Sequence, residues 1–253
     1  SGILPSQPAM PARLVYIHHD CFILEAGAKT LLFDYPASRY LPQAAARVAA
    51  AHIADTDLTI FVSHSHDDHF DPHLAAATSR AASRRFVVSD DVADLYGTVL
   101  PADTVVLEPD MVREVGGMTV EGIESNDMGL AYRIDVAGLT VYFGGDLALW
   151  DWPGNSPAAN RAVGMSWRRA LARLAERPVD VALTNMDPRL AQSLSGAPEL
   201  LNRLQPRYFA PMHLGGHVEY IEQYAERLTR DGSVLFRYAR PGDVMNIDDA
   251  PAV

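Results

Sequence analysis

The stretch Asp57-Leu-Thr-Ile-Phe-Val-Ser-His-Ser-His-Asp-Asp-His69 decides the fold of this chain. Its first half is apolar and rich in β-branched and aromatic residues, which predicts a buried strand. The strand runs into three histidines and two aspartates within positions 64–69. Asp71-Pro72 follows and predicts a helix start at 71–72, because aspartate caps helices and proline fits their first turn. Imidazoles and carboxylates between a strand end and a helix start are typical of a metal site.

The spacing of these donors suits two neighbouring metal ions. Residues two apart in extended backbone point to the same side, so His64 and His66 can bind one ion. The turn toward the helix would bring Asp68 and His69 to a second ion. A solvated polar loop is the alternative interpretation, and the position at a strand end argues against it.

The rest of the chain predicts two sheets with helices outside them. Residues 1–11 resemble a flexible leader or vector remnant without signal-peptide features, and residues 12–248 are expected to form one domain. Strands are expected at 13–18, 21–26, 30–35, 57–63, 85–89, 105–107, 118–124, 130–136, 139–143, 179–183, 207–210 and 234–238. Helices are expected at 42–54, 71–80, 91–96, 164–176, 197–204 and 217–230.

Composition narrows the class of protein. The chain has 253 residues and a formal charge of −11. Its 48% of apolar and 21% of charged residues are typical of a globular protein. Cys21 is the single cysteine and cannot form an internal disulfide, so a reducing compartment such as the cytoplasm is expected. No apolar run approaches the ~18 residues that cross a bilayer. The acidic charge disfavours nucleic acid, so we expect neither a membrane nor a nucleic-acid partner.

The loop at 64–69 has the pattern H-x-H-x-D-H, which resembles the signature of the metallo-β-lactamase fold. That resemblance implies an α/β (α+β) protein, a four-layer αββα sandwich with one or two metals at the sheet edges. Asp146 in Phe143-Gly-Gly-Asp146 resembles the family's metal-bridging aspartate, and His213 in Pro211-Met-His213 its last histidine ligand. Asp34 resembles an aspartate of the family that does not bind the metal itself but orients the residues that do. Taken alone, Asp146 also fits a turn and His213 a core histidine.

Closer motifs are similar to a bacterial branch of hydrolases in that family, which implies no particular substrate. They include Ser125-Asn-Asp-Met-Gly129, Gly144-Gly-Asp-Leu-Ala-Leu-Trp-Asp-Trp152 and Met186-Asp-Pro-Arg189. Trp150 and Trp152 are candidates for a pocket wall or for core packing. Asp187 and Arg189 are candidates for a buried ion pair or for contact with an anionic substrate.

One departure from the family concerns the first metal. The family supplies a third histidine before the Gly-Gly-Asp strand, and residues 124–129 contain none. Asp127 is the expected replacement, with Asn126, His18 and His19 as alternatives. A carboxylate ligand would favour Mn²⁺ or Fe²⁺ somewhat, although the general order of affinities still favours Zn²⁺. His217 is expected to contact a metal-binding residue or to stand at a helix start, and not to bind the metal itself.

These residues predict a hydrolase with one or two divalent metals, most readily zinc, with manganese or iron as alternatives. His64, His66 and Asp127 would hold the first ion, Asp68, His69 and His213 the second, and Asp146 would bridge them. A metal lowers the pKa of a bound water toward about 7, and Asp68 could accept that water's hydrogen bond. The expected partner is a small ester, lactone, amide or phosphoester, with a lactone preferred by analogy. The sequence does not decide whether the chain forms a homo-oligomer. A non-catalytic metal- or ligand-binding protein is the alternative.

Overall fold

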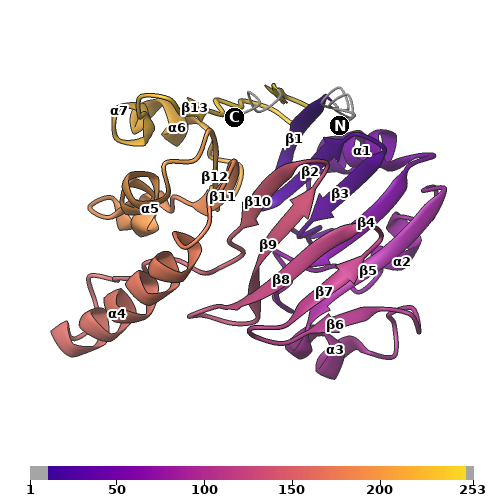
Figure 1. Cartoon of the computed structure of the whole chain (residues 1–253), viewed down its shortest axis with the longest axis horizontal. Coiled ribbons are helices and arrows are strands. Elements are labelled where there is room, and N and C mark those ends of the chain that lie inside the picture. Colours follow the sequence, from indigo (N-terminus) through magenta and orange to yellow (C-terminus); the bar gives the residue numbers. More distant parts are fainter. Residues whose placement is uncertain (1–10, 249–253) are drawn as a thin grey trace, which may run out of the picture.

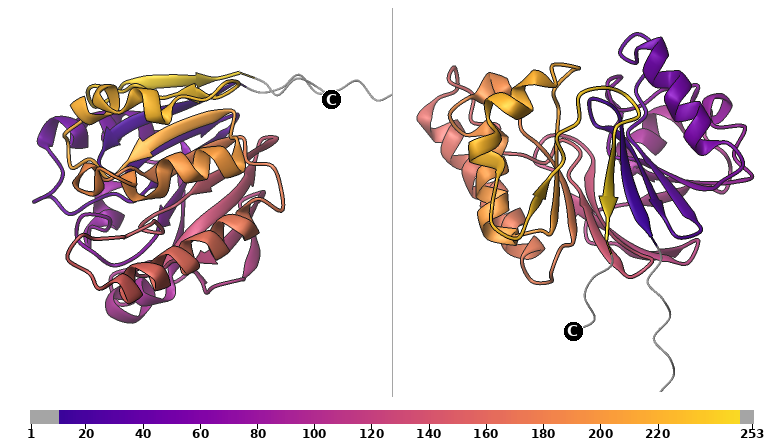
Figure 2. Two further views of the ribbon diagram at one scale, coloured as in Figure 1. Left: turned by 90° about the vertical axis from the view of Figure 1, so that its left-hand side faces the viewer. Right: turned by 90° about the horizontal axis from the view of Figure 1, so that it is seen from above.

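Two seven-stranded sheets form the centre of the protein. The computed structural model describes residues 11–248, so the predicted leader lies outside the described residues except for Pro11. Helices lie on the outer sides of the two sheets, giving the layer order helix, sheet, sheet, helix (Figure 2). The predicted four-layer αββα sandwich is therefore confirmed. Within the described range, no helix is long and apolar enough to cross a membrane.

The first sheet is built mainly from the N-terminal half (Figure 1). It contains, in spatial order, β14 (Val244–Ile247), β1 (Ala12–His18), β2 (Cys21–Ala26), β3 (Lys29–Phe33), β4 (Asp57–Val62), β5 (Ser83–Ser89) and β6 (Val105–Leu107). Strands β3 to β6 run parallel to one another. Its helices are α1 (Gln43–Ile53), α2 (Leu74–Ala77) and α3 (Asp90–Tyr96).

The second sheet takes up the remaining strands. In spatial order they are β13 (Val234–Leu235), β12 (Tyr208–Met212), β11 (Val181–Asn185), β10 (Leu139–Phe143), β9 (Leu130–Val136), β8 (Met118–Glu124) and β7 (Val112–Val115). Strands β10 to β13 run parallel. The chain there also forms α4 (Pro157–Leu174), 3₁₀ turns at Pro188–Leu190 and Leu194–Gly196, α5 (Ala197–Leu204), α6 (Glu219–Gln223) and α7 (Ala225–Leu228).

The core has two apolar parts. The larger one joins the sheets, where the rings of Phe33 and Phe143 stack with centroids 4.6 Å apart. The smaller one lies between the first sheet and its helices and includes Ile60, Ala45 and Ile53. Burying a large apolar side chain contributes roughly 1.5–3 kcal/mol, so these contacts hold the two sheets in a fixed relation.

Several predicted helix limits are wrong. The helix expected at 71–80 is only the four residues of α2, and its N-cap is His73. Asp71 does not cap it, because its carboxylate accepts a bond from the His73 backbone N–H and closes a local turn. The helix expected at 217–230 is divided at Tyr224, whose backbone leaves the helical region.

Three further features were not expected from the sequence, and one of them is the short strand β7. Helix α4 starts seven residues before its predicted start, with Pro157 in its first turn and the Ser156 side chain accepting from Ala159 N. Strand β14 was missed altogether, because its four residues join the sheet only by pairing with β1 from the opposite end of the chain.

Candidate metal centre

Strand direction brings the polar loops to one edge of the two sheets. The carboxyl ends of parallel strands lie at the same edge, and chain reversals at β1–β2 and β8–β9 reach it too. His19 and Asp20 lie in the first of these reversals and Asp127 in the second. The other polar residues directly follow parallel strands, Asp34 after β3, His64 after β4, Asp146 after β10, and His213 after β12.

Eight side chains form two groups of donors at this edge. In each group, the four donor atoms lie within 4.8 Å of one another. We call the first group cluster A and the second cluster B. Cluster A contains His64, His66, Asp127 and Asp146, and cluster B contains His19, Asp68, His69 and His213. The structure thus brings together every residue expected to bind metal, and it places the alternative candidate His19 in cluster B.

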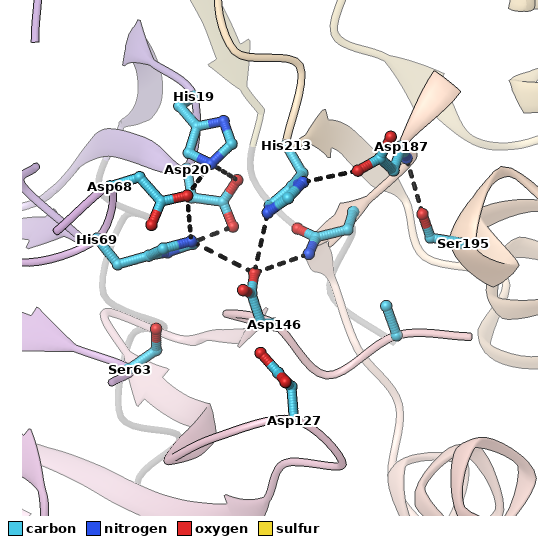
Figure 3. A network of polar contacts seen from close by, with 12 residues as sticks. His19, Asp20, Ser63, Asp68, His69, Asp127, Asp146, Asp187, Ser195 and His213 are labelled. Carbon is cyan, nitrogen blue, oxygen red and sulfur yellow. Dashed lines mark hydrogen bonds and ion pairs between the residues drawn. The ribbon is translucent and has the colours of Figure 1, made fainter. Parts of the chain in front are cut away.

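Asp146 belongs to cluster A and also faces cluster B. Figure 3 shows it between Asp127 on one side and His69 and His213 on the other. Its Oδ2 is 3.4 Å from Nε2 of His64, on the side of cluster A. Its Oδ1 is 3.3 Å from Nε2 of His213 and 3.4 Å from Nε2 of His69, on the side of cluster B. Asn185 donates to the same Oδ1 at 3.1 Å. One carboxylate therefore presents a different oxygen to each cluster.

Buried hydrogen bonds orient the imidazoles behind the clusters. Asp34 accepts from His69 Nδ1 at 2.7 Å and from the Ser63 hydroxyl at 2.6 Å. Because that hydroxyl donates to Asp34, it accepts from His64 Nδ1, at 2.8 Å. Both rings therefore carry a proton on Nδ1 and turn Nε2 toward the clusters. Neither Nε2 has a hydrogen-bond partner among the described residues, although both are buried.

His213 is held by a separate ion pair. Its Nδ1 donates to Asp187 Oδ2 at 3.1 Å, and Arg189 donates to both oxygens of the same carboxylate. Asp187 and Arg189 thus form an ion pair, which is only half buried because the Arg189 side chain is exposed. Asp187 connects this pair to His213. The ring of Trp150 meets the His213 ring edge-on at 5.3 Å, and its own face stacks on Trp152. The tryptophans support His213, and neither lines the cavity described below.

His19 has a different role from the other three residues of cluster B. Its Nδ1 accepts from the backbone N–H of Gly215 at 3.1 Å. A neutral ring that accepts at Nδ1 carries its proton on Nε2, and this Nε2 lies 3.2 Å from Asp68 Oδ2. His19 therefore donates to Asp68. Since His19 lies in cluster B with its proton on Nε2, the geometry favours Asp127 over His19 as the group beside His64 and His66.

Two glycines allow the loop that carries Asp127 to pack closely against the segment of cluster A at Ser63. Gly129 has φ +69°, and a Cβ there would lie 2.0 Å from Ser63 O. Gly145 has φ +51°, and a Cβ there would lie 2.6 Å from Ser63 Cβ. Asn126 is occupied elsewhere, since its amide donates to Ala148 O and accepts from Ala148 N. Asp127 is thus the side chain of this loop that joins the donors.

Burial and charge divide the histidines into two kinds. Burial lowers the pKa of His64, and together with the charge on His213 it lowers the pKa of His19 to about 3. Burial opposes protonation of His69 and His213 as well, but nearby carboxylates, Asp146 foremost, outweigh it. They raise the pKa of His213 to about 9 and that of His69 well above its usual value.

Asp20 is a functional candidate that the sequence reasoning missed. Its side chain is fully buried, and burial raises its pKa to about 8. The sequence did contain a signal for it. The residues His18-His19-Asp20 stand at the end of a strand, as the metal-binding candidates at 64–69 do. Backbone strain marks the same region, since His19, Asp34 and His213 all adopt positive φ.

The donors fit divalent metal ions. Cluster A offers two imidazoles and two carboxylates, and cluster B offers Asp68, His69 and His213 with Asp146 beside them. Imidazole nitrogens and carboxylate oxygens are ligands of zinc, manganese and iron. The buried Nε2 atoms of His64 and His69, which have no hydrogen-bond partner in the described structure, are what an ion would satisfy.

A cavity of about 680 Å³ opens beside cluster B. Asp68, His213, Arg39 and Arg189 are among the residues that line it. Both guanidinium groups are largely exposed, at 66% and 64%, and each is paired with one carboxylate, Asp67 or Asp187.

Two other expected residues line the cavity without joining a cluster. His18 lies next to Gly216, and His217 is 70% exposed and contacts Glu219. Neither belongs to a donor group in the part of the chain that the structure describes. His217 lies just before α6, which agrees with the second of its two expected positions, the start of a helix.

Comparison with known proteins supports the same fold. The profile of the beta-lactamase superfamily domain matches residues 13–150. No curated protein matches the sequence. The chain is similar to Igni18, a metallo hydrolase from the archaeon Ignicoccus hospitalis, with a TM-score of 0.63, 14% identity, and coverage of 95% of this chain and 100% of that one.

Two further solved structures are similar. One is YhfI from Bacillus subtilis, a metallo-beta-lactamase fold protein, with a TM-score of 0.62, 14% identity and coverage of 94% and 99% of the two chains. The other is CmlA, a diiron β-hydroxylase from Streptomyces venezuelae, with a TM-score of 0.61, 13% identity and coverage of 95% of this chain and 54% of that one. At these identities the likeness shows the fold.

Proposed function

This chain belongs to the beta-lactamase superfamily, and we propose that it is a metal-dependent hydrolase of a small ester, lactone, amide or phosphoester. The observation that carries the proposal is the position of Asp146, whose two oxygens face different clusters. A carboxylate in this position suits a pair of ions better than a purely structural site, which would be closed around one ion.

The residues of the two clusters would divide the binding of the metals. His64, His66 and Asp127 would hold one ion, Asp68, His69 and His213 the other, and Asp146 would bind both. When bound, divalent ions supply an acidified water and a Lewis acid for the substrate oxygen. Affinity order favours zinc, while the carboxylate of Asp127 shifts the preference toward manganese or iron.

The chain's own groups would position the reacting water. Asp68 Oδ2 accepts the hydrogen bond from His19, which fixes the conformation of this side chain in the wall of the cavity. Its carboxylate can accept a hydrogen bond from the water that attacks the substrate. His19 is neutral at pH 7 because its pKa is lowered to about 3, so it remains a donor throughout the reaction.

The cavity favours a substrate that carries an anionic group. Arg39 and Arg189 line the cavity that holds Asp68 and His213. A guanidinium has five N–H donors, so pairing with one carboxylate leaves others for a carboxylate or phosphate of the substrate. A small carboxylated lactone or a phosphorylated ester therefore fits the site better than a neutral one. A small-molecule partner and a cytoplasmic setting complete the proposal, and the free buried thiol of Cys21 is compatible with that setting.

The test combines metal analysis with a substrate panel. Protein purified without added metal should contain about two divalent ions per chain, measured by mass spectrometry of the elements. It should hydrolyse members of a panel of esters, lactones and phosphodiesters, with lower KM for those carrying a carboxylate or phosphate. Absence of both metal and turnover would favour a non-catalytic protein that keeps the fold.

A further inference from the structure

Asp20 is a buried carboxylate that has no hydrogen-bond partner within residues 11–248. Its side chain is fully buried in the turn between β1 and β2, and both oxygens lack a hydrogen bond. Figure 3 shows it between His19 and His69, facing the interior of cluster B. A buried carboxylate is costly unless a cation or a hydrogen-bond donor compensates it, so this group requires a partner.

The neighbouring histidines provide no hydrogen bond to Asp20, although the charge of His69 faces it in the metal-free protein. His69 Nδ1 lies 3.8 Å from Asp20 Oδ2, but its proton is given to Asp34 at 2.7 Å. His19 Nε2 lies 4.0 Å from Asp20 Oδ1, but its proton is given to Asp68 at 3.2 Å. Each of these two protons is therefore donated to another carboxylate.

The position of Asp20 suits a cation instead. A carboxylate oxygen of Asp20, a ring nitrogen of His69 and a carboxylate oxygen of Asp146 lie within 4.8 Å of one another. His69 and Asp146 are also the two residues that connect cluster B to the bridging position. A cation held by His69 and Asp146 would thus have the carboxylate of Asp20 beside it. Asp68 lies on the side of cluster B, 3.5 Å from Nε2 of the same His69.

We propose that Asp20 is an additional carboxylate ligand of the ion in cluster B and makes this site select manganese-like ions over zinc. The inference rests on the proposed metal centre. With Asp20, the donors become two imidazoles and three carboxylates, since His19 keeps its proton on Nε2. Such an oxygen-rich set of more than four donors favours Mn²⁺ or Fe²⁺ relative to zinc, which prefers four ligands.

The experiment compares metal binding by the whole chain and by Asp20→Asn. Metal-free protein is titrated separately with Mn²⁺ and with Zn²⁺, and thermal unfolding is measured before loading. Asp20→Asn should weaken Mn²⁺ binding at one of the two sites by about tenfold or more and weaken Zn²⁺ binding much less. The Tm of the metal-free variant should not fall, because the lost carboxylate has no hydrogen bond to lose.

Asp34→Asn is the matched control, since Asp34 is also buried beside His69 but accepts three hydrogen bonds. It should lower the Tm of the metal-free protein. Unchanged Mn²⁺ affinity in Asp20→Asn, or a fall in its metal-free Tm like that of Asp34→Asn, would overturn the role of Asp20.

A measurement on the unaltered chain gives an independent check. Co²⁺ bound to both sites should show at least one ion with the weak visible absorption of five or six ligands. Intense tetrahedral bands from both ions would argue against an additional ligand. If the unaltered chain bound neither Mn²⁺ nor Zn²⁺, the proposed function itself would fail, whereas normal binding with an unaffected Asp20→Asn would reject the role of Asp20 alone.

Discussion

His19 and Asp68 are joined by a hydrogen bond of 3.2 Å in which the neutral imidazole is the donor. The direction follows from the backbone N–H of Gly215, which occupies His19 Nδ1 and leaves the proton on Nε2. The bond connects the β1–β2 turn to the loop at 64–69 and fixes a carboxylate that lines the cavity.

The first prediction concerns His19→Ala. Because His19 donates to Asp68 and does not face the ions with a free nitrogen, the variant should keep both metal ions. It should lose roughly 10–100-fold in kcat, since Asp68 is no longer held in place. Metal content and kcat measured on the same preparation test this, and loss of one metal equivalent would identify His19 as a ligand.

The second prediction concerns the carboxylate that stands where the family has a histidine. Asp127→Ala should reduce the metal content from about two ions to about one, because cluster A then keeps two histidines and the shared Asp146. Asp127→His should restore the second ion with zinc favoured. Glu124→Ala is the control, as it removes an exposed charge nearby outside both clusters. Two retained ions in Asp127→Ala would exclude Asp127 as a ligand.

The third prediction concerns the close approach of two loops. Gly129→Ala should destabilise the protein by about 3 kcal/mol or more, because the new Cβ would meet Ser63 O at 2.0 Å. Gly138→Ala is the control, with φ +81° and no atom within 4 Å of the new Cβ. It should cost only about 1 kcal/mol of backbone strain. Chemical denaturation of both variants measures the difference, and equal losses would contradict the contact.

The fourth prediction concerns pH. The pKa of His213 is raised from 6.5 to about 9, so this imidazole is charged at pH 7 in the metal-free fold. A group with a raised pKa stabilises the fold below its unfolded value and loses that contribution as the pH rises through its folded value. The metal-free protein should therefore lose stability between about pH 6.5 and 9, by thermal unfolding.

Whereas the stability of the metal-free protein should fall as the pH rises, its affinity for metal should increase. An ion must displace the protons of His213 and His69, whose pKa is also raised. The affinity should rise about tenfold per pH unit for each proton displaced, between pH 6 and 8. Competition with a chelating dye at several pH values measures this. A flat affinity would show that neither histidine binds the ion.

The sequence by itself determined the chemistry of the loop at 64–69 and the fold around it. Periodicity and strand propensity depend on neighbouring residues, so a buried strand followed by imidazoles and carboxylates is legible from the chain. The positions of Asp146 and His213 after later strands could be predicted in the same way. The limits of the helices could be predicted less well, because the break at Tyr224 and the turn at Asp71 depend on how the chain folds in three dimensions.

Only the tertiary structure decided how these donors share the site. The opposed oxygens of Asp146 depend on the parallel strands that bring β4, β10 and β12 to one edge. The tautomer of His19 depends on Gly215, which is 196 positions away along the chain. Asp20 was overlooked because the meaning of a lone aspartate depends on its burial and on whether its neighbours' protons are already used. Such properties arise from contacts between distant segments, which local sequence patterns do not encode.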